Sequence, residues 1–245
     1  MIKSLVLILA LLSTQSSPGP LFIAGGNISD VKIYSRFIET VGPGKVAIVT
    51  TASTIPNFNK DFWKKAGLKN FVLVGPKDSF PQNVKAIWFS GGDQTLLERN
   101  YVGKKFEADL LKFWRSGGII GGTSAGTAIM SRIMIRGSEK DEPEIGTGFD
   151  LMPNCILDQH FSERKRLPRL QNACELHPGL VGIGVDENTA IVYDKGVMEI
   201  IGHAGVTVVF EGRSITLETG KRYYYPFREK NANNNSRQSA SITKK

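Results

Sequence analysis

The sequence contains few of the residues that bind metals and little that would hold it in a membrane. Its 245 residues include three histidines and two cysteines, whose scattered positions lack the spacing of a zinc site. The apolar run of residues 4–12 is too short to span a bilayer, and no internal repeat is present. We therefore predict no metal, no cofactor and no membrane attachment of the mature chain.

Positive charge is concentrated at the end of the chain. The formal net charge is +8, and residues 221–245 hold seven Lys or Arg against one Glu, so they supply +6 and leave +2 for the rest. No aromatic–basic recognition motif accompanies this charge, which argues against nucleic acid as a partner. Residues 231–245, rich in Asn, Ser and Lys, are predicted to be a disordered basic tail.

The N-terminus has the pattern of a secretory signal peptide. Lys3 precedes the apolar run, and small polar residues lead from it to Pro18. We predict a signal peptide over residues 1–17, a single domain over residues 18–230 and a secreted, extracellular protein. An oxidising compartment permits a disulfide between Cys155 and Cys174; two buried free thiols are the alternative, and the sequence does not choose between them.

Apolar, β-prone runs alternate with helical patterns in the first half of the chain. The helical spacing of apolar residues covers 30–41 and 104–115. This alternation predicts an α/β fold with a doubly wound, mostly parallel sheet and helices on both faces. Turn signals after residue 180 predict additional C-terminal β-hairpins, at the sheet edge or packed beside it. The predicted strands fall in residues 21–26, 46–51, 70–75, 86–92 and 118–122.

The segment around Ser124 has the pattern of a nucleophile elbow. An apolar strand runs into Gly-Thr-Ser-Ala-Gly over residues 122–126, and apolar helical sequence follows. The backbone N–H groups of Ala125 and Gly92 are the predicted oxyanion-hole donors, and Gln94 in the same loop as Gly92 is expected to contact substrate. The alternative is a glycine-rich turn that packs a helix against the sheet.

His160 is the predicted base. It ends an apolar strand that carries polar residues at its carboxyl end, which would place it on the same sheet rim as Ser124. Asp186 and Glu187 follow a later apolar strand, and one of them should orient the imidazole; strand alternation cannot choose between them. The resulting order, serine then histidine then acid, differs from that of the α/β-hydrolases.

Three arginines are crowded just beyond His160. Guanidinium groups bind carboxylates through two hydrogen bonds, so Arg164, Arg166 and Arg169 predict an acidic substrate. The alternative is a solvated basic helix face.

At these residues the sequence resembles the cyanophycinase family, which includes aspartyl dipeptidases and has a class-I glutamine-amidotransferase-like fold. The resemblance implies that Glu187 is the acid of a Ser124–His160–Glu187 triad. It also implies a substrate pocket shaped by Gln94, Asp158, Gln159, Arg164, Arg166 and Arg169. The matching motifs are G-G-D-Q at 91–94, G-G-T-S-A-G at 121–126, D-Q-H-F-S-x-R-x-R-L-x-R-L at 158–170 and G-I-G-V-D-E-x-T-A at 182–190.

The expected function is that of a secreted serine exopeptidase that hydrolyses an aspartate-rich peptide or cyanophycin-like polymer to β-Asp-Arg dipeptides through an acyl-enzyme. Such a substrate offers carboxylates to the arginines and guanidinium groups to Asp158 or another acid. The alternatives are an aspartyl dipeptidase or related small-substrate amidase, and a catalytically silent carboxylate-binding protein. The oligomeric state is left open, a homodimer included.

Overall fold

The structure is a computed structural model that describes residues 17–56 and 58–225. The predicted signal peptide, except for Ser17, and the predicted basic tail lie outside the described residues. Within those two ranges, no helix is both long enough and apolar enough to cross a membrane.

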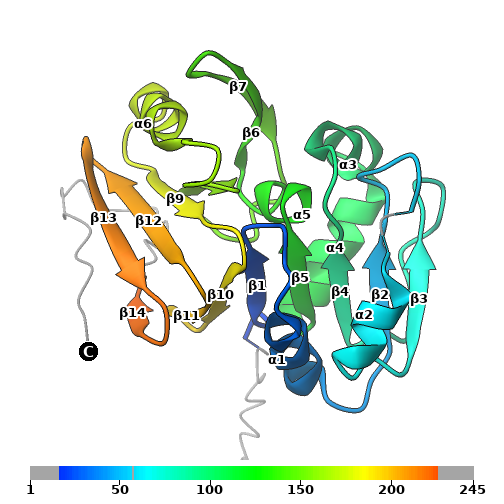
Figure 1. The fold of residues 1–245 in the computed structure, drawn as a ribbon. Helices are drawn as coiled ribbons and strands as arrows, with labels where there is room; N and C mark the ends of the chain where they lie inside the picture. Colours follow the sequence, from blue (N-terminus) through cyan, green and yellow to red (C-terminus); the bar gives the residue numbers. More distant parts are fainter. Residues whose placement is uncertain (1–16, 57, 226–245) are drawn as a thin grey trace, which may run out of the picture.

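The centre of the molecule is an eight-stranded sheet with the strand order β14-β11-β10-β1-β5-β4-β2-β3 (Figure 1). Five neighbouring strands, from β1 to β3 in this order, run parallel, and the three others are antiparallel. The prediction of a mostly parallel sheet is confirmed. The strands are β1 (Leu21–Ala24), β2 (Val46–Val49), β3 (Phe71–Val74), β4 (Ala86–Phe89), β5 (Ile119–Thr123), β10 (Thr189–Asp194), β11 (Val197–Gly202) and β14 (Arg222–Tyr224).

Helices cover both faces of this main sheet. On one face, α1 (Val31–Val41) and α2 (Lys60–Lys65) bury Phe37 and Trp63 against the sheet. On the other, α3 (Gln94–Tyr101) and α4 (Lys105–Arg115) bury Leu97 and Leu110. The inner strands are apolar throughout because both of their faces are covered.

A second sheet, with the order β13-β12-β9-β8, packs beside the main one. Strands β8 and β9 pair in parallel, and α6 (Leu167–Leu176) covers them. The predicted C-terminal hairpins are divided: β10–β11 extends the main sheet, and β12–β13 belongs to the second one. The other elements are β6 (Ile133–Glu139) and β7 (Glu142–Thr147), which form a separate hairpin, β8 (Cys155–Gln159), β9 (Val181–Val185), β12 (Gly205–Phe210) and β13 (Arg213–Glu218).

The second sheet corrects one sequence expectation. His160 follows β8 and Glu187 follows β9, so the predicted base and acid do not come from the rim of the sheet that carries Ser124. The prediction was wrong because an apolar strand pattern does not reveal which sheet a strand joins.

The helix that follows Ser124 is also shorter than expected. Helix α5 (Ala125–Ala128) has four residues, and the chain then leaves the helical path. The carbonyl oxygens of Ile129 and Met130 accept hydrogen bonds from the N–H groups of Phe149 and Leu151, so tertiary contacts replace the next helical turn. A single helical turn has only a small macrodipole. Negative charge that develops near Ser124 would therefore be stabilised mainly by individual N–H groups.

Cys155 and Cys174 are free thiols in the structure. Cys155 is buried, and its Sγ lies 3.1 Å from the carbonyl oxygen of Met152. Burial raises the pKa of both thiols, that of Cys174 to about 11, so neither is poised to act as a nucleophile.

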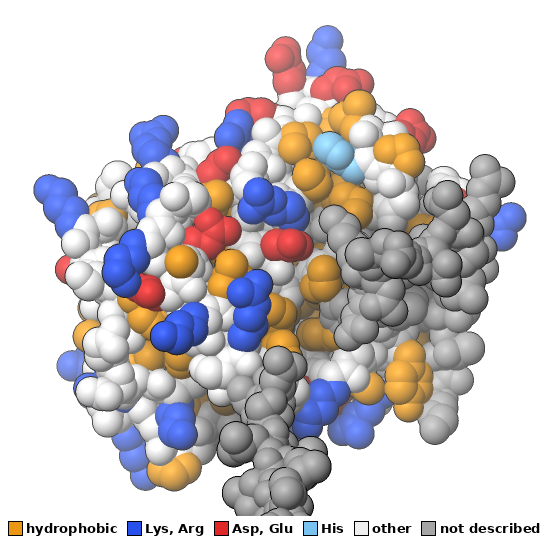
Figure 2. Space-filling model, turned by 180° about the vertical axis from the view of Figure 1, so that it is seen from behind, with side chains coloured by type: hydrophobic (Ala, Val, Ile, Leu, Met, Phe, Trp, Pro, Cys, Tyr) orange, Lys and Arg blue, Asp and Glu red, His pale blue; other side chains and the backbone are white. Residues whose placement is uncertain are grey.

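On the face opposite to the view of Figure 1, Lys and Arg side chains are scattered among acidic and apolar ones (Figure 2). They do not gather there into one basic stripe of the kind that tracks a nucleic-acid backbone.

Candidate active site

Ser124 sits on a strained turn at the carboxyl end of β5. Its backbone has φ 54° and ψ −113°, a conformation that few non-glycine residues adopt. The flanking glycines are required sterically: a Cβ on Gly122 would lie 2.4 Å from the Gly126 carbonyl oxygen, and one on Gly126 would lie 2.1 Å from that of Phe89. The turn therefore presents the hydroxyl beyond the sheet edge, as a nucleophile elbow does.

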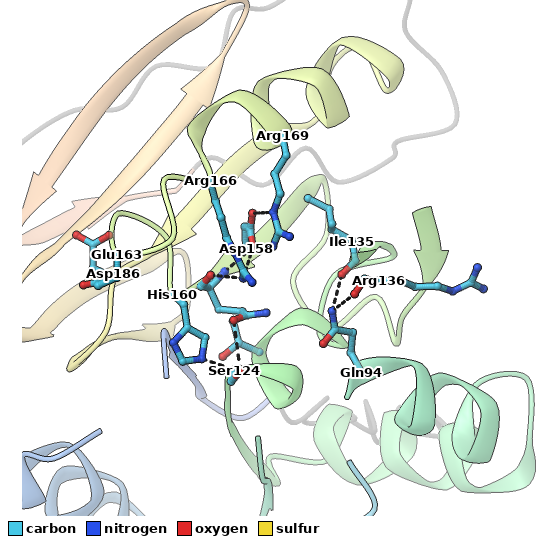
Figure 3. Close-up of polar contacts among 12 residues, drawn as sticks. Gln94, Ser124, Ile135, Arg136, Asp158, His160, Glu163, Arg166, Arg169 and Asp186 are labelled. Carbon is cyan, nitrogen blue, oxygen red and sulfur yellow. Dashed lines mark hydrogen bonds and ion pairs between the residues drawn. The ribbon is translucent and has the colours of Figure 1, made fainter. Parts of the chain in front are cut away.

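The structure brings Ser124, His160 and Glu187 into one hydrogen-bonded chain. Figure 3 shows the contact between His160 and Ser124. His160 Nε2 lies 2.9 Å from Ser124 Oγ, and His160 Nδ1 lies 2.6 Å from Glu187 Oε1. Asp186, the other candidate acid, instead accepts the backbone N–H groups of Ser162 and Gly205, at 3.0 and 3.1 Å. These hydrogen bonds link segments of the second sheet, and Asp186 does not contact the imidazole.

The other two histidines lie elsewhere. His177 is the C-cap of α6, and the exposed His203 pairs with Asp30 at 2.8 Å. The histidine predicted from the sequence, His160, is the one that contacts Ser124.

Residues 24–27, which we call the anchor segment, form hydrogen bonds with all three residues, Ser124, His160 and Glu187. The carbonyl of Ala24 accepts the Ser124 N–H at 3.1 Å, and the carbonyl of Gly25 accepts the His160 N–H at 2.7 Å. Asn27 Nδ2 donates to Glu187 Oε2 at 2.6 Å. A Cβ on Gly26 would lie 2.3 Å from the imidazole, so the anchor segment also packs directly against the ring of His160.

Sequence reasoning missed this role of Asn27. Its only signal was an Asn that follows two glycines after an apolar strand, which reads as an ordinary turn. Glu163 was missed as well: its carboxylate accepts the backbone N–H of Glu187 at 3.2 Å and fixes that residue from the other side.

The electrostatic surroundings suit a neutral imidazole beside an ionised carboxylate. Burial lowers the pKa of His160 below its ordinary 6.5. The hydrogen bond that His160 donates to Glu187 opposes this effect, and the positive charge of Arg164 adds to it. Two hydrogen bonds lower the pKa of Glu187. The larger effect comes from the bond that it accepts from the Asn27 amide, and the smaller from the bond that it accepts from His160. At neutral pH, His160 can therefore accept the Ser124 proton, and Glu187 can stabilise the imidazolium that forms.

The predicted oxyanion donors lie beside Ser124. Ala125 begins α5, and Gly92 lines the same cleft as Ser124. No hydrogen bond within residues 17–56 and 58–225 uses the N–H group of either residue. A Cβ on Gly92 would lie 2.1 Å from the Ala52 carbonyl oxygen, so only glycine fits where this loop packs against Ala52.

Ser124 opens into a cleft of about 680 Å³. One wall is cationic and carries Arg136, Arg164 and Arg166. The Arg166 Nη1 donates to the Gln159 carbonyl at 2.5 Å, and burial lowers the pKa of Arg166 to about 10. Arg164 is exposed and forms no ion pair within the described part of the chain, which leaves its guanidinium available to a ligand carboxylate.

Asp158 and Arg169 do not lie where the sequence suggested. Asp158 is 1% exposed and accepts two hydrogen bonds from Arg169, which is itself buried, and one from Arg166 at 3.3 Å. Neither Asp158 nor Arg169 lines the cleft. The expectation that Asp158 meets a substrate guanidinium is therefore corrected: its charge is already matched by two internal arginines (Figure 3), and the network holds Arg166 in place.

The two predicted glutamines do line the cleft. Gln94 Nε2 donates to the carbonyl oxygens of Ile135 and Arg136, so the amide is fixed with Oε1 as its remaining polar atom (Figure 3). Gln159 Oε1 lies 3.3 Å from Ser124 Oγ, farther than His160 Nε2 and therefore a weaker competitor for the hydroxyl proton.

Arg136 is a cleft residue that sequence reasoning missed. It lies on β6 where a register shift between Ile135 and Gly137 interrupts the hairpin, a feature that can redirect a side chain. Glu98 accepts two of its hydrogen bonds, at 2.6 and 2.7 Å, and holds the guanidinium at the cleft. No motif surrounds Arg136 in the sequence, so no local signal could have found it.

Aromatic side chains from the main sheet and its helices also line the cleft. We call Tyr34, Phe62, Trp63 and Trp88 the aromatic wall. No group of three or more His, Cys, Asp or Glu side chains in the described ranges is arranged to hold a metal ion.

Comparison with known proteins identifies the family. The model of peptidase family S51 matches residues 74–201, about half of the chain. A cyanophycinase from Geminocystis herdmanii is 31% identical over 202 residues, which cover 73% of this chain and 74% of that protein. The chain belongs to peptidase family S51.

Further matches agree with this assignment. A cyanophycinase from Synechococcus elongatus is 30% identical over 206 residues, covering 73% of this chain and 63% of that relative, so the chain spans less than two thirds of its length. The crystal structure of a peptidase from an acI-B1 actinobacterium has the same fold, with a TM-score of 0.66 and 21% identity over 86% of this chain and 98% of that one. The S51 match includes Ser124, His160 and Glu187 but not the anchor segment.

Proposed function

We propose that this S51 family member is a secreted serine peptidase that cleaves aspartyl bonds in an acidic, cyanophycin-like substrate. One observation carries the proposal: a serine, a neutral histidine and an ionised glutamate form a continuous relay at the mouth of an arginine-lined cleft. Serine nucleophiles are activated by this arrangement on several unrelated folds. Secretion rests on the signal-peptide pattern of residues 1–17.

Acylation follows from the distances. His160 Nε2 removes the proton of Ser124 Oγ as the oxygen bonds to the substrate carbonyl carbon. The N–H groups of Ala125 and Gly92 stabilise the oxyanion, and each such donor contributes about 10²–10³-fold to the rate in comparable sites. The imidazolium then gives its proton to the leaving nitrogen as the C–N bond breaks, while Glu187 holds the ring and balances its charge.

Deacylation uses the same groups in reverse. His160 takes a proton from a water molecule, whose oxygen attacks the acyl carbon, and the bond between this carbon and Ser124 Oγ breaks. The proton returns from the imidazolium to Ser124, which restores the starting state.

The cationic wall supports an acidic substrate. Arg164 and Arg166 lie beside the relay, and Arg136 reaches the cleft from the β6–β7 hairpin. Free carboxylates of such a substrate are suited to these guanidinium groups. The two cyanophycinase relatives favour cyanophycin as the substrate, with β-Asp-Arg dipeptides as the product.

An aspartyl dipeptidase is the second candidate. A cleft of about 680 Å³ has the size of a small-molecule site, which favours a short substrate.

The deciding experiment compares insoluble cyanophycin with Asp-X dipeptides, using purified protein that begins at residue 18. We expect soluble β-Asp-Arg from cyanophycin and a loss of about 10⁴-fold or more in Ser124→Ala. Faster cleavage of Asp-X dipeptides would select the second candidate. A Ser124→Ala variant with full activity, or wild type that fails to react with a serine-directed phosphonate, would refute the peptidase proposal and leave a carboxylate-binding protein.

A further inference from the structure

The cleft contains one acidic side chain that the proposed mechanism does not use. Asp93 is the only carboxylate among the described residues that line the cleft, which also carry three arginines. Asp93 is exposed, and none of the ion pairs within residues 17–56 and 58–225 involves it. Because the neighbouring arginines do not pair with it, its charge is available to a cationic group on a ligand.

The structural role of Asp93 occupies only half of its carboxylate. Asp93 is the N-cap of α3, and its Oδ1 accepts the backbone N–H and the hydroxyl of Thr95, at 2.8 and 2.6 Å. No hydrogen bond in the described part of the chain uses its Oδ2. Helix capping and ligand binding can therefore use different oxygens of the same side chain.

The loop that carries Asp93 packs against the proposed nucleophile. A Cβ on Gly91 would lie 3.3 Å from the Cβ of Ser124, and the N–H of Asp93 donates to the Ala52 carbonyl at 2.7 Å, which fixes the loop. The next residue, Gln94, directs its amide N–H groups to the protein and retains Oε1 as an acceptor at the cleft. A guanidinium has five N–H donors, so it can donate to both residues.

Other groups near the cleft are less suited to a guanidinium. Asp158 is 1% exposed, and two internal arginines already match its charge. In the aromatic wall, Tyr34, Trp63 and Trp88 are at most 9% exposed, which leaves little ring surface for a cation–π contact. Asp93 is therefore the best placed counter-ion for a cationic ligand group.

We propose that Asp93 is a specificity-determining residue that binds the guanidinium of an arginine-bearing substrate, while the cleft arginines bind the free carboxylates of that substrate. A β-Asp-Arg unit carries both charges, so each would meet a group of opposite charge in one cleft. The identity of this unit rests on the proposed function. The preference for a cationic over a neutral side chain does not.

Binding to a Ser124→Ala protein, which lacks the proposed nucleophile, tests this role. Calorimetry compares the proposed product β-Asp-Arg with β-Asp-citrulline, in which a neutral urea replaces the guanidinium. A charge-assisted contact at an exposed carboxylate predicts that β-Asp-Arg binds about 3- to 10-fold more tightly. Adding Asp93→Asn should abolish this difference, and it keeps the α3 cap because Asn is as good an N-cap as Asp.

Asp61→Asn is the matched control. It removes an equal charge from α2, at an exposed residue that does not line the cleft, and it should leave the preference for β-Asp-Arg unchanged. If Asp61→Asn reduced the preference as much as Asp93→Asn does, the general charge of the protein and not Asp93 would be the cause, and the assignment would fail.

The other outcomes separate this inference from the peptidase proposal. Equal affinities for the two peptides, no measurable binding of β-Asp-Arg, or a preference that Asp93→Asn leaves intact would each overturn the role of Asp93. A preference that Asp93→Asn alone abolishes supports it. If the wild-type protein shows this preference but releases nothing from cyanophycin, the result counts against the peptidase proposal alone.

Discussion

The two sheets contribute to the proposed active site in different ways. The main sheet supplies Ser124 from a turn whose shape is set by neighbouring glycines, so the geometry of the nucleophile is encoded locally. The second sheet supplies His160 and Glu187, and these reach Ser124 only because the two sheets pack together. A local motif can therefore specify the proposed nucleophile, whereas the proposed base and acid depend on long-range packing.

The two sheets also differ in what holds them near the site. Around β5 the main sheet is stabilised by apolar side chains on both faces. The carboxyl end of β8, by contrast, encloses an ionic network of Asp158, Arg166 and Arg169. Buried ion pairs contribute little net stability when complete, but they are costly when one partner is lost. The second sheet should therefore be the more sensitive to charge substitutions.

The largest expected effect comes from Asp158→Asn. It leaves the buried guanidinium of Arg169 and the partly buried one of Arg166 without a counter-ion, and we expect a loss of about 3–5 kcal/mol in the free energy of unfolding. Chemical denaturation measures this loss. The matched control is Asp109→Asn, which removes a surface pair with Lys105 and should cost about 1 kcal/mol or less. Equal effects of the two substitutions would contradict the contrast between the sheets.

Gly26→Ala tests how the sheets are joined at the anchor segment. The new methyl group would overlap the His160 ring, and displacing a catalytic group by about 1 Å can cost about 100-fold in rate. We expect kcat/KM to fall by that order while the fold, followed by circular dichroism, persists. Gly103→Ala is the control, because Gly103 also has a positive φ of 72° but nothing within 4 Å of a Cβ. If both variants lost activity alike, backbone strain and not the contact with His160 would be the cause.

The smallest effect concerns the pH dependence of activity. His160 must be neutral to accept a proton, so activity falls as the pH drops through its pKa, which lies below 6.5 in the folded protein. Arg164→Gln removes a positive charge that lowers this pKa, and the acidic limb of the kcat/KM profile should move to higher pH. Lys165→Gln, at the neighbouring exposed residue, should leave the limb in place. A shift in the opposite direction would show that Arg164 does not act through His160.

The sequence predicted the main sheet well for a physical reason. Its inner strands are buried on both faces and read as continuous apolar runs, and the elbow at Ser124 has a short, local pattern. The division into two sheets and the β6–β7 hairpin were not predicted, because strand pairing is a long-range property.

Individual site residues show the same limit. Tyr34 looked like one core position of an amphipathic helix, and its place in a cleft follows only from the packing of α1 beside α2 and β4. Asp158 and Arg169 lie in the motif that resembles the family, yet they pair with each other inside the protein, which no linear pattern reveals.

The anchor segment has a consequence for when the proposed peptidase could first act. Residues 24–27 leave the ribosome early, whereas Glu187 emerges 160 residues after Asn27, which takes roughly 10–30 s at ordinary rates of translation. Until Glu187 has emerged, the anchor segment lacks one of the residues with which it forms hydrogen bonds. Hydrolytic capacity is thus delayed until most of the polypeptide has been made, so an unfinished chain cannot digest its surroundings.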